Sequence, residues 1–119
     1  MIRRLFPITA LLALLFAATP GQGADEGSDK VFEADFGAAT VDVSDYPEEM
    51  RELYPLYARK CSKCHTLARS INSTYRGDEW DRYVARMSRK PNSGISPGTG
   101  DKILTFLKYH FGRADGDDG

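Results

Sequence analysis

The chain is poor in the residues that build disulfide scaffolds and metal clusters, with two cysteines and two histidines among 119 residues. A zinc site on Cys61, Cys64 and His65 would need a fourth ligand, and His110 is the only other histidine. Strand-like alternation is weak and no internal repeat is present. This argues against the strand-rich scaffold of thioredoxin-like Cys-x-x-Cys proteins. We therefore expect one small domain that is mostly helical.

Only one long apolar run is present, over residues 5–18, and it follows the basic pair Arg3 and Arg4. It is shorter than the ~20 residues that span a bilayer comfortably, and small, turn-forming residues come after it. This order is typical of a secretory signal peptide, with an uncleaved anchor as the alternative. We expect removal of residues 1–23, a periplasmic or otherwise exported protein, and no transmembrane segment in the mature chain.

Charge is unevenly distributed, although the formal net charge is only −1. Residues 24–58 hold ten acidic and two basic residues, whereas residues 59–90 hold nine basic and three acidic ones. A charged run is usually a solvated face, but a basic segment around the cysteines could also steer an acidic partner protein. An exported, net acidic chain is not expected to bind nucleic acid.

A first helix is predicted before the cysteines. Ser44 or Asp45 is a suitable N-cap, and Asp45 with Glu48 resembles a capping box. Pro55 predicts a bend or a late start of this helix. Apolar residues recur at helical spacing through it, at Met50, Leu53, Tyr54 and Tyr57.

Two further helices follow the cysteines. Gly77 and Asp78 open the second, which should stop at about Arg89, before Pro91. One face of it is apolar and carries Trp80, Tyr83, Val84 and Met87. In the third helix, Ser96 and Pro97 are the N-cap and first residue, and Gly112 closes it. Two polar segments flank the helices: an extended or disordered lead-in at residues 24–44 and a disordered tail at residues 113–119.

The run Cys61-Ser62-Lys63-Cys64-His65 is the central motif, because Cys-x-x-Cys-His is typical of a site where haem is covalently attached. Two cysteines three positions apart on a helical turn point the same way and can reach the two vinyl groups of a porphyrin. The next residue, His65, then lies where a ring nitrogen can bind the iron. Its other ring nitrogen should donate to an acceptor, which we expect within residues 66–76. A structural disulfide is the alternative, but it leaves His65 unexplained.

The sixth iron ligand is predicted to be Met87, because an electron carrier gains from a filled sixth position. The alternative is that Met87 is an ordinary core residue, as methionine at helical spacing usually is. Met50 precedes the motif on the first helix. His110 is a weaker candidate, since a histidine near a helix C-terminus also interacts with the helix dipole. An open sixth position is the remaining possibility.

Residues 44–111 resemble the small monohaem class I cytochrome c family. Three segments carry the resemblance: Tyr57-x-x-x-Cys61-x-x-Cys64-His65, Trp80-x-x-Tyr83-Val84-x-Arg86-Met87, and Ile95-Ser96 through Lys102-Ile103-Leu104-Thr105-Phe106-Leu107. The resemblance implies an all-α, cytochrome c-like domain at residues 45–112, with three to four helices around one covalently bound haem. It also implies that the first and last helices cross, with Tyr57 contacting Ile103 and Phe106.

The expected function is single-electron transfer between redox proteins, not catalysis, with the protein acting freely or as the cytochrome subunit of an oxidoreductase. Cys61, Cys64, His65, Met87 and Trp80 are the predicted haem-binding residues. Trp80 could hydrogen-bond a haem propionate or simply pack in the core. The redox partner should carry an acidic docking face. Two alternatives remain, a haem-based sensor with an open sixth site and a helical adaptor stapled by a disulfide.

Overall fold

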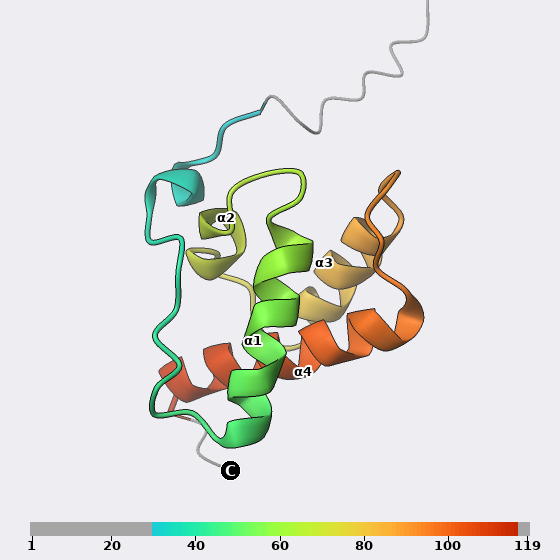
Figure 1. The fold of residues 1–119 in the computed structure, drawn as a ribbon. Helices are drawn as coiled ribbons and strands as arrows, with labels where there is room; N and C mark the ends of the chain where they lie inside the picture. Colours follow the sequence, from blue (N-terminus) through green and yellow to red (C-terminus); the bar gives the residue numbers. More distant parts are fainter. Residues whose placement is uncertain (1–29, 117–119) are drawn as a thin grey trace, which may run out of the picture.

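The computed structural model describes residues 30–116, and within this range all regular secondary structure is helical, without strands (Figure 1). The elements are a 3₁₀ helix η1 (Glu33–Phe36) and four α-helices, α1 (Glu48–Cys61), α2 (Ala68–Ile71), α3 (Asp78–Ser88) and α4 (Pro97–Ala114). The predicted all-α class, with three to four helices, is confirmed. The signal-peptide prediction lies outside the described residues. None of the described helices is long and apolar enough to cross a membrane.

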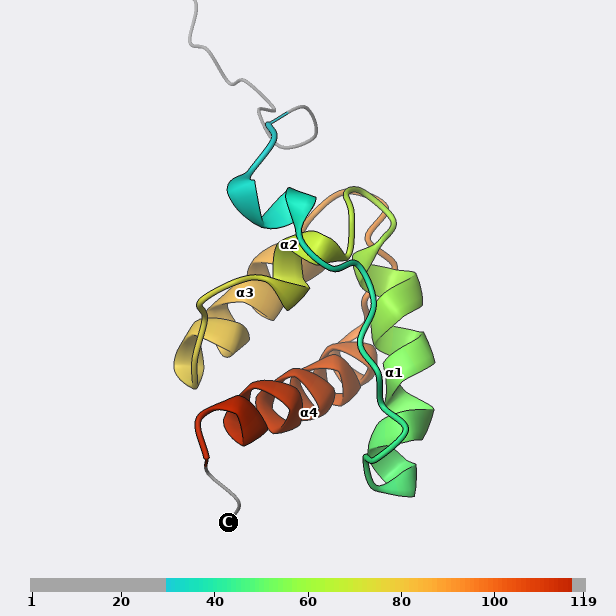
Figure 2. The ribbon, with the colours of Figure 1, turned by 90° about the vertical axis from the view of Figure 1, so that its left-hand side faces the viewer.

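The core forms where α4 packs against both α1 and α3 (Figures 1 and 2). Tyr57 of α1 stacks on Phe106 of α4, with ring centroids 5.0 Å apart, and Ile103 belongs to the same cluster. All three side chains are almost inaccessible to solvent. Trp80 of α3 packs on Phe111 at the other end of α4, with a centroid distance of 4.6 Å. The expected contact of Tyr57 with the last helix is therefore present.

Helix α1 differs from its prediction at its N-terminus. Its N-cap is Pro47, not Ser44 or Asp45. Asp45 instead accepts hydrogen bonds from Arg113 of α4. Its carboxylate therefore forms a tertiary ion pair and does not cap the helix. Pro55 neither delays nor ends the helix, which continues through it on an exposed side.

Helices α3 and α4 begin where the sequence predicts. Gly77 caps α3 with a φ of 47°, a left-handed conformation that glycine adopts without steric cost. Ser96 caps α4, its Oγ accepting from the Thr99 N–H at 3.2 Å. The end of α4 is later than predicted, because the helix runs through Gly112 to Ala114. Buried Phe111 and the Arg113–Asp45 pair hold this last turn in place.

Residues 30–47 precede α1 as a strap along the outside of the helices (Figure 2). The strap contains η1, which packs against α2, and is otherwise without regular structure. Neither η1 nor α2 was predicted, since each is a single turn with no periodic apolar pattern. Together they bring residues far apart in the sequence to one end of the molecule.

Candidate haem site

A cavity of about 700 Å³ opens between the end of α1, the loop around α2, and α3. Its volume lies within the roughly 300–1,000 Å³ of sites that take small molecules and cofactors. Four predicted site residues line it together, Cys61, Cys64, His65 and Met87. The fold thus brings together, around one cavity, residues from α1, the loop that follows it, and α3.

The motif itself straddles the end of α1. Cys61 is the last residue of the helix, whereas Cys64 lies in the irregular loop beyond Ser62. The expectation that both cysteines share a helical turn is therefore wrong for Cys64. Lys60 and Lys63 hold the motif against the facing loop, where they donate to backbone carbonyl oxygens of Gly94 and Asn92 at 2.7 and 2.8 Å.

Both cysteines are free thiols, so no disulfide joins them in this structure. Burial raises the pKa of the Cys61 thiol to about 12. A thiol of this kind is a poor nucleophile at neutral pH, unlike the attacking cysteine of thiol–disulfide oxidoreductases, whose pKa is lowered. The environment of Cys61 therefore does not favour a redox-active dithiol.

One ring nitrogen of His65 is held by a backbone carbonyl. Its Nδ1 lies 3.1 Å from the carbonyl oxygen of Thr66, within the loop where an acceptor was expected. Because a carbonyl only accepts, this hydrogen bond requires Nδ1 to carry the proton. Nε2 then keeps its lone pair, and a backbone acceptor of this kind fixes the ring and raises the basicity of Nε2.

Met87 reaches the cavity from α3, one helical turn beyond Tyr83. Met87 is half-buried and packs against the core cluster, so it keeps both a core role and access to the cavity. Tyr83 also lines the cavity and is only 5% exposed, yet its hydroxyl has no hydrogen-bond partner among the described residues. A buried hydroxyl without a partner is unusual and fits a site that a polar cofactor completes.

Three other candidates lie away from the cavity lining. Trp80 is fully buried in the core against Tyr75 and Phe111, and its indole N–H has no partner among the described residues. Met50 is buried near the start of α1. His110 shares a hydrogen bond of 2.6 Å with Tyr46, far along α4 from the motif. Neither Trp80 nor His110 is among the residues that the fold brings to the cavity.

Several lining residues were not predicted. Phe32 and Ala34 come from the strap, and Ile95 comes from the loop before α4. The lead-in had no helical period and so gave no indication that Phe32 would face the motif. The rim is basic, as the charge distribution suggested, with Lys60, Lys63, Arg86 and Lys90 all lining the cavity.

No protein-family model matches this chain, and no curated protein or solved structure matches it either. The predicted resemblance to the small monohaem class I cytochrome c family is therefore wrong as a family assignment. Among residues 30–116, moreover, no group of three or more His, Cys, Asp or Glu side chains could hold a metal ion. A five-residue motif and helical spacing are local features that unrelated helical proteins can share.

Proposed function

We propose that this protein is an exported, monohaem c-type cytochrome that carries single electrons between redox proteins, freely or as the cytochrome subunit of an oxidoreductase. The proposal depends on one observation: Cys61, Cys64, His65 and Met87 line the same cavity of about 700 Å³.

The donor set fits a haem better than a metal ion alone. A structural zinc site needs four converging ligands, whereas haem takes its protein ligands one from each face of the porphyrin. In the proposed arrangement, Cys61 and Cys64 would hold the porphyrin through thioether bonds and His65 would be a ligand of the iron. When bound, haem supplies an iron that changes its oxidation state by one electron. The protein contributes attachment, ligand orientation and exclusion of water.

Met87 is the proposed sixth ligand, because it approaches the cavity from α3 while His65 approaches from the loop after α1. A thioether ligand raises the reduction potential relative to a second histidine. With His65 and Met87 both holding the iron, the site would offer no open position to a substrate. This is the physical reason to propose electron transfer without catalysis.

The proposed partner is a redox protein with an acidic docking face, because the cavity rim carries Lys60, Lys63, Arg86 and Lys90. Long-range attraction between such faces raises the association rate and is screened by salt. We expect the rate of electron exchange with an acidic redox protein to fall as ionic strength rises. A rate that is indifferent to salt would contradict steering by this rim.

The absorption spectrum and mass of the mature protein test the attachment. The protein should be made in a host that installs c-type haem, and we expect a haem spectrum and a mass above that of the polypeptide by one haem. The matched control is the double variant C61S/C64S, which keeps His65 and Met87. A colourless wild-type protein with the mass of the bare polypeptide would refute the proposal.

Carbon monoxide distinguishes the electron carrier from the alternative, a haem-based sensor with an open sixth site. We expect the reduced wild-type protein not to bind carbon monoxide readily and Met87→Ala to bind it. Met50→Ala is the control, since Met50 does not line the cavity. Rapid binding by the wild type, with no spectral change in Met87→Ala, would favour the sensor.

A further inference from the structure

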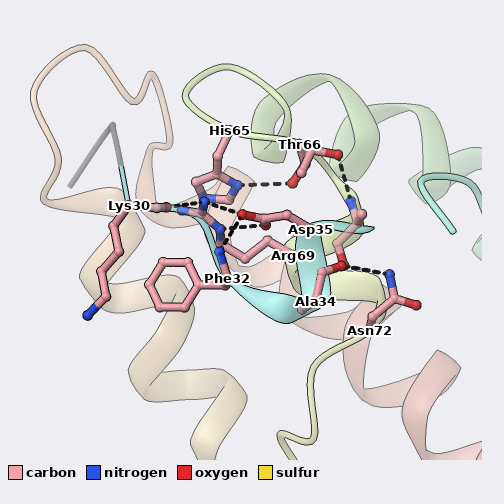
Figure 3. Close-up of polar contacts among 9 residues, drawn as sticks. Lys30, Phe32, Ala34, Asp35, His65, Thr66, Arg69 and Asn72 are labelled. Atoms are coloured by element: carbon pink, nitrogen blue, oxygen red, sulfur yellow. Dashed lines mark hydrogen bonds and ion pairs between the residues drawn. The ribbon is translucent and has the colours of Figure 1, made fainter. Parts of the chain in front are cut away.

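The segment before α1 lies against the cavity without any buried side chain of its own. None of the residues of η1 is buried, and Phe36 is 81% exposed. Apolar burial therefore does not explain why this turn is held in one place. Polar contacts with α2 and its flanking residues do (Figure 3).

The first anchor is a two-point ion pair. Arg69 donates from Nε and Nη2 to the two carboxylate oxygens of Asp35, at 2.8 and 2.7 Å. The two side chains are only 16% and 10% exposed, so the pair is largely withdrawn from solvent. Arg69 also donates to the backbone carbonyl of Lys30 at 2.9 Å, which ties the start of the strap to α2.

The second anchor is Asn72, at the end of α2. Its side-chain amide donates to the carbonyl oxygens of Ala34 and Ala38, at 3.1 and 2.9 Å, one on each side of Gly37. Gly37 packs so closely on this amide that a Cβ there would overlap it. A side chain at this position would therefore have to displace the Asn72 amide from its contacts with the strap.

At the first anchor, Phe32 lines the cavity and its ring lies under the Arg69 guanidinium, 4.4 Å from ring centroid to Cζ. Figure 3 shows the Phe32 ring, Arg69 and Asp35 grouped beside His65. The strap thus places an aromatic side chain next to the motif from a segment about thirty residues earlier in the chain.

We propose that residues 30–38 form a wall of the haem cavity, in which Phe32 covers the bound group and Asn72 and the Asp35–Arg69 pair are positioning residues. This inference rests on the function proposed above. Such a wall limits the contact of the cofactor with water. Burial is one of the properties that set the potential of a haem, since water stabilises the more highly charged oxidised state.

Gly37→Ala tests the wall without changing any charge, because the added methyl group must displace the Asn72 amide. Gly112→Ala is the matched control, since a Cβ at Gly112 meets nothing within 4 Å. In Gly37→Ala holoprotein we expect amide exchange of residues 32–37 to accelerate roughly tenfold or more, as for loss of local hydrogen bonds. We also expect the midpoint potential to fall, while Gly112→Ala leaves both unchanged.

Phe32→Ala is the second variant, because it removes the covering side chain while the Asp35–Arg69 pair and the Asn72 contacts remain. We expect its midpoint potential to fall as well. If haem is bound and both variants keep the wild-type potential, the wall is refuted and the proposed function stands. If no haem is attached in the wild type, the proposed function itself has failed, whatever the exchange rates of the strap.

Discussion

The contact of α1 with α4 and the contact of the strap with α2 are built by opposite means. In the first, Tyr57 and Phe106 are each no more than 1% exposed and stack on one another. In the second, η1 buries no residue and is held by the Asp35–Arg69 pair and by Asn72. Apolar burial supplies free energy, whereas the polar anchors mainly supply position. The core should therefore respond to truncation, and the strap to pH and to loss of single polar groups.

The largest effect is expected from Phe106→Ala. Phe106 is fully buried and touches aromatic rings of both α1 and the strap, so truncation should lower the free energy of unfolding by about 3–5 kcal/mol. Urea unfolding of the holoprotein measures it. Lys102→Ala, at an exposed position of the same helix, should change it by less than about 0.5 kcal/mol. Equal effects of the two variants would contradict the proposed source of stability.

An intermediate effect is expected from Tyr57→Phe, which keeps the stacked ring and removes only the hydroxyl. That hydroxyl lies 2.5 Å from Ser70 Oγ, in a fully buried contact that links α1 to α2. Its loss should lower the free energy of unfolding by about 1 kcal/mol, because Ser70 retains its bond to the Leu67 carbonyl. Urea unfolding again provides the measurement. A loss as large as that of Phe106→Ala would show that the polar link, not the ring, holds α1 in place.

Lowering the pH is expected to have the smallest effect on global stability, while its effect on the strap is specific. Hydrogen bonding to Arg69, with a further bond from the Phe32 N–H, lowers the pKa of Asp35 from 3.8 to about 2. Since the pKa in the folded protein is lowered, the stabilising contribution of the Asp35–Arg69 pair is complete above the ordinary pKa of aspartate. It is lost as the pH falls through 2. NMR titration should give an Asp35 midpoint near 2, accompanied by shifts of the residue 32–37 amides.

Asp35→Asn is the control for this titration, because it removes the titrating group and retains the shape of the side chain. The acid transition of the strap amides should disappear in this variant. A wild-type midpoint near 3.8, or strap shifts that persist in Asp35→Asn, would show that the ion pair does not hold the strap.

Much of the helical framework was predictable because its signals are local. The Ser96-Pro97 start of α4 and the Gly77 start of α3 depend on a few adjacent residues. Errors arose where a distant partner overrode a local preference. Asp45 was predicted to cap α1 but pairs with Arg113, 68 residues away. The same reason explains why the strap was not predicted to form a wall, since Asp35 and Arg69 are 34 residues apart.

What the sequence by itself determined is the chemistry available: the spacing of Cys61, Cys64 and His65, and an apolar face on α3 that carries Met87. Those features depend on residues three or four positions apart, so they can be recognised in the sequence alone. Only the tertiary structure decided that these residues share a cavity, that Trp80 lies in the core, and that Phe32 faces the motif. Such contacts join segments with no common period, and packing and ion pairing between them leave no local pattern in the chain.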